Sequence, residues 1–329
     1  MYLDYITNLR AVAICAIVLH HTIFAFCGWP PCVQHSVETS PYILHMCAFL
    51  RIFGLGIFTY ISGYLFNLGM TRHPERAFLD FFKGKVYRLL IPLGFFGLLY
   101  WILFPKYVGD GYHFPVIEGS PLWYLPMLFI IFMVSFAIQK FNDRKIRILA
   151  IATTEVLFYI SCKLEIPFSG NLFIYYPCFL FGAYANTIID IVRRYLSIYL
   201  SIYLSIYLLI LAGILYLQID PEISSALPNQ VKILLEMITV ISTATVIFGI
   251  FKTKNIRFPK TLKLIGNKSF GIYLIHQLII NTIVTLFFFQ GSAWPNILLL
   301  FIVVVSISMG MILLLEYKPI AKFSKYIGV

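Results

Sequence analysis

The stretch that decides the fold is Arg10-Ala-Val-Ala-Ile-Cys-Ala-Ile-Val-Leu-His-His21, which places a cation and an imidazole inside an apolar segment. An ionisable side chain within a membrane helix costs roughly 2.5 to 3.5 kcal/mol on insertion scales, so it usually has a functional reason. Eleven residues of α-helix return to within about 20° of the starting direction and rise about 16 Å. We therefore expect Arg10 and His21 to share one face of the first membrane helix, whereas His20 points about 100° away from His21.

The composition is that of an integral membrane protein. The chain has 329 residues, of which 60% are hydrophobic and only 12% are charged, and its mean hydropathy is +0.87. Soluble domains contain about 25% charged residues. We predict an all-α polytopic membrane protein that forms a single domain over residues 1–329, and we expect its first helix to be retained rather than cleaved as a signal peptide.

The distribution of cations predicts about ten membrane helices with both termini in the cytoplasm. With the N-terminus placed inside, Lys106, Lys163 and Lys232 are the only Lys and Arg residues on the outer side, and Arg51 falls within the second span. The others of the 25 lie on the inner side, as the positive-inside rule requires. The net charge of +11 then needs no nucleic acid as partner, because a cytoplasmic rim of cations attracts anionic lipids and anionic substrates. The predicted spans are 6–27, 42–68, 89–104, 121–139, 146–162, 171–189, 195–218, 231–251, 265–289 and 295–317.

Several further polar residues fall at membrane depth. Ser269, Tyr273 and His276 have the spacing i, i+4, i+7 and form a stripe on the ninth predicted helix, which suits either helix packing or a reactive site. Arg51 needs an anionic partner or an aqueous cavity, and Glu155 and Glu236 are the available carboxylates.

A cluster of cations precedes the third predicted span. Lys83, Lys85 and Arg88 lie at its cytoplasmic end, where they could bind phosphate groups or serve only as positive-inside anchors.

Two other features have simpler interpretations. Cys27 and Cys32 lie together at the outer end of the first helix, where a disulfide or two free thiols are possible. The sequence Leu-Ser-Ile-Tyr occurs three times in tandem from Leu196 to Tyr207, which we interpret as a duplicated helical spacer. No cysteine pair has the spacing of a zinc site, and we expect no metal.

The motifs together resemble those of the membrane acyltransferase-3 family, over nearly the whole chain. Besides Arg10 and His21, they are Ile61-Ser-Gly-Tyr-Leu65, Lys85-Val-Tyr-Arg-Leu-Leu-Ile-Pro92, Leu122-Trp-Tyr-Leu125, Phe179-Leu-Phe-Gly-Ala-Tyr-Ala185 and Leu264-Ile-Gly-Asn-Lys-Ser-Phe-Gly-Ile-Tyr-Leu-Ile-His276. The resemblance implies ten helices in the cell inner or plasma membrane. It also implies transfer of an acyl group, usually acetyl from acetyl-CoA, to a hydroxyl of a cell-surface polysaccharide or its lipid-linked sugar precursor.

The resemblance implies that Arg10 and His21 are the required pair, with His21 as the catalytic group. A CoA thioester carries its phosphates far from its reactive carbon, so cations at the cytoplasmic end and a base deeper in the bilayer suit it. We hypothesise that Lys83, Lys85 and Arg88 hold the phosphates and that Arg10 guides the pantetheine arm. His21 would act as general base toward the acceptor hydroxyl or carry the acyl group itself, and His276 or Tyr273 would stabilise the oxyanion.

The partners expected from this hypothesis are acyl-CoA, the glycan or lipid-linked acceptor, membrane lipids and proteins of glycan synthesis. The competing function is a proton-coupled carrier or flippase for a glycan or small anion, in which His21, Arg51 and the glutamates form a proton or substrate path.

Overall fold

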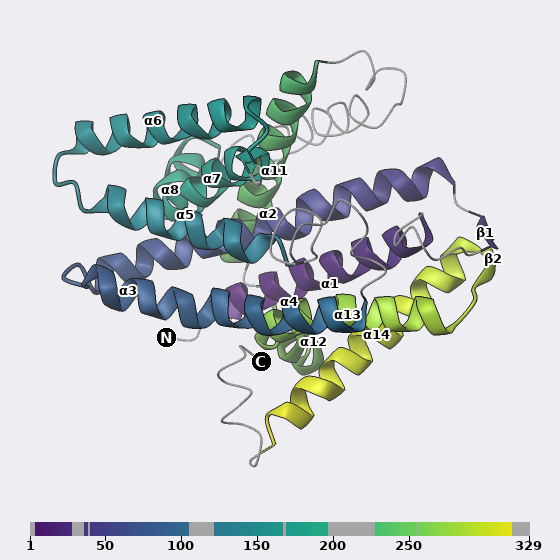
Figure 1. The fold of residues 1–329 in the computed structure, drawn as a ribbon. Helices are drawn as coiled ribbons and strands as arrows, with labels where there is room; N and C mark the ends of the chain where they lie inside the picture. The colour runs from purple at the N-terminus through teal and green to yellow at the C-terminus, as the bar shows by residue number, and fades with distance from the viewer. Residues whose placement is uncertain are drawn as a thin grey trace. The chain divides into compact units, whose positions relative to one another are not determined.

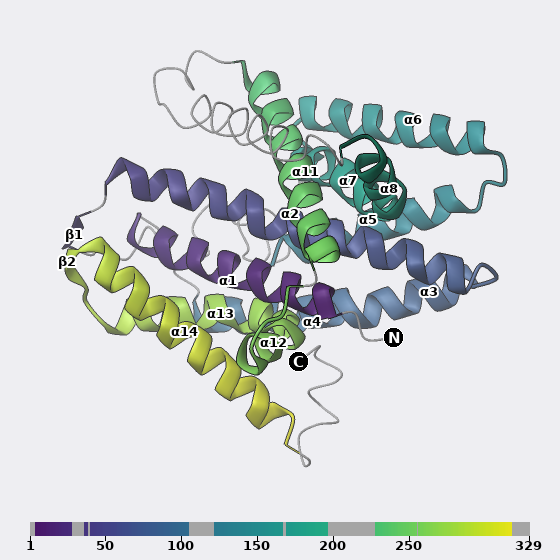
Figure 2. The same ribbon diagram turned by 180° about the vertical axis from the view of Figure 1, so that it is seen from behind.

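The computed structural model describes residues 4–27, 36–38, 40–104, 122–166, 169–196, 228–254 and 256–317. The chain divides into two compact units, whose helices and strands are labelled in Figures 1 and 2. The first unit comprises Met1–Gly54, Arg76–Ala150 and Ile256–Val329, and the second comprises Leu55–Glu75 and Ile151–Asn255. Two helices, α2 (Pro41–Arg72) and α6 (Arg144–Lys163), run from one unit into the other.

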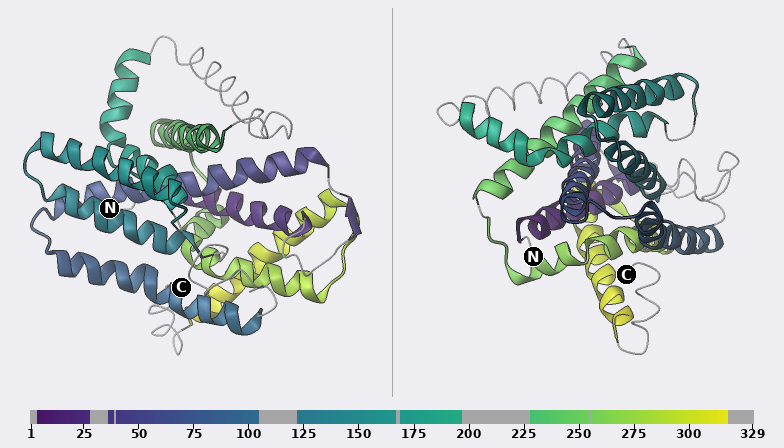
Figure 3. Two further views of the ribbon diagram at one scale, coloured as in Figure 1. Left: turned by 45° about the horizontal axis from the view of Figure 1, so that its top comes forward. Right: turned by 90° about the vertical axis from the view of Figure 1, so that its left-hand side faces the viewer.

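The first unit is built around α1 (Asp4–Phe26), which is apolar on nearly all sides and mostly buried. It packs against α12 (Lys260–Asn267), α13 (Ser269–Leu286) and α14 (Ala293–Leu315). The last two helices form a hairpin whose connection includes the short strand β2 (Gln290–Ser292), as Figure 3 shows. This strand pairs in parallel with β1 (Ser36–Glu38), which precedes α2. The core of this unit therefore encloses the helix that carries Arg10 and His21.

One continuous rod of the first unit contains a π-helical turn. It consists of α3 (Phe78–Lys85), the π-helix η1 (Val86–Leu90) and α4 (Ile91–Leu103), and it is followed in the chain by α5 (Tyr124–Gln139). The backbone N–H of Ile91 bonds to the carbonyl of Val86, five residues back. Proline has no N–H, so Pro92 cannot bond to the carbonyl four residues before it, and the turn that precedes it is free to widen.

The second unit contains α7 (Ser169–Ala183), α8 (Ala185–Leu196) and α11 (Asn229–Lys254), with the second half of α2. Two glycines bring α2 and α7 into backbone contact. A Cβ on Gly63 would lie 1.9 Å from the carbonyl oxygen of Phe179, and one on Gly182 would lie 2.1 Å from that of Tyr60. Small residues allow such close approach in membrane helices, which explains why both glycines occur in apolar motifs.

The structure confirms an all-α, multi-pass membrane protein and refines the predicted spans. Six helices of the described residues are long and apolar enough to cross a bilayer: Asp4–Phe26, Tyr42–Arg72, Phe78–Leu103, Asn229–Lys254, Ser269–Leu286 and Ala293–Leu315. Tyr124–Gln139 is apolar but shorter. The segment predicted as one span at 171–189 divides into α7 and α8, because the polar residues after Tyr184 make α8 amphipathic. The total of ten spans and the cytoplasmic termini stay predictions.

Two of the predicted features lie wholly or partly outside the described residues. The span at 195–218 and the Leu-Ser-Ile-Tyr repeat lie almost wholly outside the described residues. Cys27 is a free thiol, whereas Cys32 lies outside the described residues.

Candidate active site

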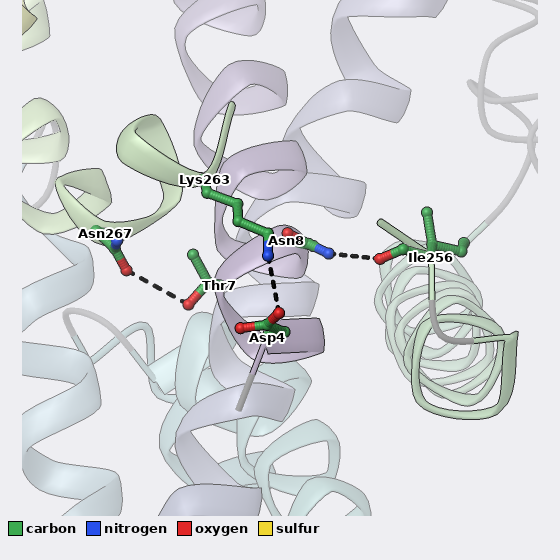
Figure 4. Close-up of polar contacts among 6 residues, drawn as sticks. All are labelled: Asp4, Thr7, Asn8, Ile256, Lys263 and Asn267. Carbon is green, nitrogen blue, oxygen red and sulfur yellow. Dashed lines mark hydrogen bonds and ion pairs between the residues drawn. The ribbon is translucent and has the colours of Figure 1, made fainter. Parts of the chain in front are cut away.

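The N-terminal turns of α1 are fixed by polar contacts with α12 and the segment before it (Figure 4). The Lys263 ammonium contacts the Asp4 carboxylate at 2.8 Å, and the Asn8 side-chain amide donates to the carbonyl of Ile256 at 2.7 Å. Asn8 is fully buried and Ile256 is partly buried, so this hydrogen bond is shielded on the side of α1. These contacts set the height and rotation of α1, and thus where its reactive side chains lie.

A backbone contact holds α12 against the same turns. A Cβ on Gly266 would lie 2.1 Å from the carbonyl oxygen of Thr7, so only glycine fits there. The hydroxyl of Thr7 also donates to the Asn267 side chain at 3.4 Å, as Figure 4 shows. Because α13 begins two residues after Asn267, this contact also places α13 beside α1.

At the centre of the site, His21 of α1 meets His276 of α13. The Nδ1 atom of His21 lies 3.3 Å from Nε2 of His276, and the two ring centroids are 5.0 Å apart. His276 is completely buried. The structure therefore brings together two predicted site residues that are 255 positions apart in the chain.

The backbone around the two rings determines where their protons lie. Nδ1 of His276 is 3.0 Å from the carbonyl oxygen of Ile272 and 2.8 Å from that of Tyr273, and since carbonyls only accept, this nitrogen carries the hydrogen. In the neutral ring Nε2 of His276 is then an acceptor. Nδ1 of His21 lies between that acceptor and the carbonyl oxygen of Ile17, at 2.9 Å, so it too is a donor. The lone pair of His21 is consequently on Nε2.

His20 lies beside His21 but contacts a different helix. Its Nδ1 is 2.9 Å from the carbonyl oxygen of Cys47 in α2, and the two histidine rings meet edge to face at 4.7 Å. Because this carbonyl only accepts, Nδ1 of His20 carries the hydrogen and the lone pair of His20 is on Nε2 as well. Two features distinguish His21 from His20: His21 contacts His276, and it shares a helix face with Arg10. Arg51, one turn beyond Cys47, is close enough to act electrostatically on His20.

Tyr273 is buried next to His276 and has a structural partner. Its ring is centred 5.9 Å from that of His276 and 6.0 Å from that of Tyr124, the first residue of α5. The Tyr273 hydroxyl is also hydrogen-bonded to the backbone of Tyr124. This contact joins α13 to the start of α5, where backbone N–H groups have no partner within the helix.

Arg10 is half-buried on α1, which is unbroken from Asp4 to Phe26. The helical spacing that places Arg10 and His21 on one face about 16 Å apart therefore applies.

The predicted cation cluster divides into two parts. The Lys85 ammonium lies 3.2 Å from the ring centroid of Phe132, and it is repelled electrostatically by Arg88 and by Arg76 from the preceding loop. Lys83 is exposed and points about 200° away from Lys85 around α3, so it does not join them. Within the described part of the chain, none of Lys85, Arg88 and Arg76 forms an ion pair with a carboxylate.

Two buried residues that the sequence did not single out extend the polar face of α13. Gln277 and Asn281 are buried; the Gln277 amide donates to Oδ1 of Asn281, and the Asn281 amide donates to the hydroxyl of Tyr100 in α4. The sequence feature that could have identified Gln277 and Asn281 is a pair of carboxamides four residues apart in an apolar segment. Arg76 was also missed, because only the folded chain brings it to Lys85.

The carboxylates proposed for Arg51 belong to the second unit, whereas Arg51 is in the first. The carboxylate oxygens of Glu155 are buried without a hydrogen-bond partner among the described residues, and Glu236 is partly buried. Their pairing with Arg51 stays a prediction.

Comparison with known proteins agrees with this arrangement of motifs. No curated protein and no solved structure matches the chain. Residues 3–315 match the acyltransferase-3 family model, which describes an acyltransferase domain. The match covers all the residues placed in the site above. The chain therefore belongs to the acyltransferase-3 family of membrane acyltransferases.

Proposed function

We propose that this acyltransferase moves an acyl group, most simply acetyl, from acyl-CoA to a hydroxyl of a cell-surface polysaccharide or its lipid-linked sugar precursor. The observation that carries the proposal is the open Nε2 of His21, held in place by His276 and the Ile17 carbonyl. A correctly oriented imidazole lone pair is what a general base for a hydroxyl requires.

The reaction balances with one base. The acceptor hydroxyl gives its proton to Nε2 of His21 while its oxygen bonds to the thioester carbon. The tetrahedral intermediate then collapses, the carbon–sulfur bond breaks, and the imidazolium returns the proton to the CoA sulfur. Both nitrogens of His276 already have partners, so we assign it to positioning His21 and not to the oxyanion.

The cations supply the other requirement, which is a site for the donor. Lys85 is repelled by Arg88 and Arg76, and none of the three is paired with a carboxylate among the described residues, so an anion nearby would relieve the repulsion. The phosphates of CoA are such an anion. Arg10 lies on the His21 face and would guide the pantetheine arm. We place the protein in the cell inner or plasma membrane, where it would work with glycan-synthesis proteins.

The experiment uses purified protein in lipid nanodiscs with radiolabelled acetyl-CoA and extracted lipid-linked sugars. We expect label to appear in the sugar fraction. His21→Ala should reduce this transfer by about 10²- to 10⁴-fold, the usual contribution of a general base. The matched control is His20→Ala, in which the neighbouring imidazole is removed, and its loss should be much smaller.

Two results would contradict the proposal. If the His21→Ala protein still transferred the acyl group at the wild-type rate, His21 would not be the general base. Uptake of the sugar or of a small anion into vesicles, without any acylation, would favour the carrier or flippase instead.

A further inference from the structure

A buried chain of polar side chains continues beyond His276 toward the Leu286 end of α13. The Gln277 amide nitrogen donates to Oδ1 of Asn281 at 3.0 Å, and the Asn281 amide nitrogen donates to the Tyr100 hydroxyl at 2.5 Å. Gln277 is 3% exposed and Asn281 is fully buried. Amide groups are costly to bury in a membrane protein, so a chain of this kind needs a reason.

Helix packing explains only part of this chain. The bond from Asn281 to Tyr100 joins α13 to α4, as polar residues between membrane helices commonly do. Gln277, however, bonds only within its own helix, and its Oε1 atom is buried with no hydrogen-bond partner among the described residues. An apolar residue at position 277 would pack there without leaving a buried acceptor. The unpartnered oxygen therefore points to a ligand that donates a hydrogen bond.

The position of Gln277 indicates which substrate supplies that hydrogen. Arg10, expected to guide the donor, lies toward the Asp4 end of α1, whereas Gln277 follows His276 on the side away from α12 and that end. Two reactants that meet at His21 would then arrive from opposite ends. A carboxamide oxygen cannot bind phosphate, which only accepts, but it can accept from the hydroxyl of a sugar.

We propose that Gln277 binds a hydroxyl of the acceptor sugar and holds that sugar beside His21. Asn281 and Tyr100 act as positioning residues that orient the Gln277 amide so that Oε1 faces the acceptor. This subsite rests on the proposed function, because it assigns one of the two substrates of that reaction. It makes Gln277 a determinant of which hydroxyl-bearing acceptor is used.

The test measures how the acyl group partitions between sugar and water. Protein in nanodiscs receives radiolabelled acetyl-CoA and extracted lipid-linked sugars, and transfer to sugar is compared with hydrolysis of the thioester. Gln277→Leu should lower transfer to sugar by about tenfold, the value of one hydrogen bond, while the rate of thioester hydrolysis stays within about twofold, so the transfer-to-hydrolysis ratio falls by about tenfold. Gln277→Glu keeps an acceptor oxygen, and it should restore the ratio to within about threefold once the Asn281 amide reverses.

The matched control is Thr282→Val on the same helix. The Thr282 hydroxyl is exposed and donates to the carbonyl of Leu278 in its own helix, so its loss should leave the ratio unchanged. A proportional fall of transfer and hydrolysis in Gln277→Leu would mean a structural role and would overturn the proposal. A raised KM for acetyl-CoA at an unchanged ratio would assign Gln277 to the pantetheine amides, and would overturn it too.

The test also separates this subsite from the reaction on which it rests. Wild-type protein that never labels sugar contradicts the proposed function itself. Transfer that depends on His21 but is indifferent to Gln277→Leu contradicts the subsite alone.

Discussion

Replacing His276 with phenylalanine tests whether this ring takes part in the reaction or only orients His21. The substitution removes the acceptor that lies 3.3 Å from Nδ1 of His21, but the carbonyl of Ile17 stays at 2.9 Å and holds the same proton. One neutral hydrogen bond contributes about 0.5 to 1.5 kcal/mol, so the turnover should fall by about tenfold at most. His276→Gln should lose less, because its amide oxygen can take the place of Nε2.

The assay is the initial rate of acyl transfer with both substrates saturating, for both variants and for His21→Ala in parallel. A monodisperse elution profile in detergent shows whether each variant is folded. A fall in turnover of His276→Phe as large as that of His21→Ala, about 10²-fold or more, with no rescue by glutamine, would contradict a purely orienting role for His276. His276 would then act on the reacting atoms, as an oxyanion donor or an acid.

The two remaining predictions use neighbouring residues as controls. Gly63→Ala places a Cβ 1.9 Å from a backbone oxygen of α7, so it should lower the free energy of unfolding by about 1 to 3 kcal/mol or more. Its control is Gly69→Ala, where nothing lies within 4 Å of the added Cβ; this change should be neutral or stabilising by up to about 1 kcal/mol. Thermal unfolding measures both. Equal melting temperatures would show that α2 and α7 separate freely at Gly63. Lys85→Gln with Arg88→Gln should raise the KM for acetyl-CoA by about tenfold and not that for acetyl-pantetheine, which lacks the phosphates, and Lys83→Gln should change neither. An equal increase for both donors would show that these cations do not bind phosphate.

Much of the site follows from helical periodicity. The length and apolar character of the first segment predicted α1, and eleven residues at 100° each placed Arg10 and His21 on one face. The same arithmetic predicted a stripe containing Tyr273 and His276, and both are buried on α13. The same periodicity also places Lys83 and Lys85, which were predicted to act together, on different sides of α3.

Helical periodicity does not show which other helix packs against each face of a helix. The contact between His21 and His276 depends on α12, whose Gly266 lies against the backbone of Thr7. No spacing in the sequence relates segments so far apart. The carboxamides of Gln277 and Asn281 were visible as an i, i+4 pair, but their connection to Tyr100 requires the packing of α4 on α13.

Because of the π-helical turn at Val86–Leu90, the site depends on the exact number of residues in the rod formed by α3, η1 and α4. A π-turn contains one residue more than the α-helical turn it replaces, so the side chains after it are rotated by about 100° relative to a regular helix. Deleting one residue there would leave a longer regular helix, yet it would turn Tyr100 away from Asn281 while Lys85 stayed in place. We therefore expect insertions and deletions to be rare at this turn among homologues, although its residue types are ordinary.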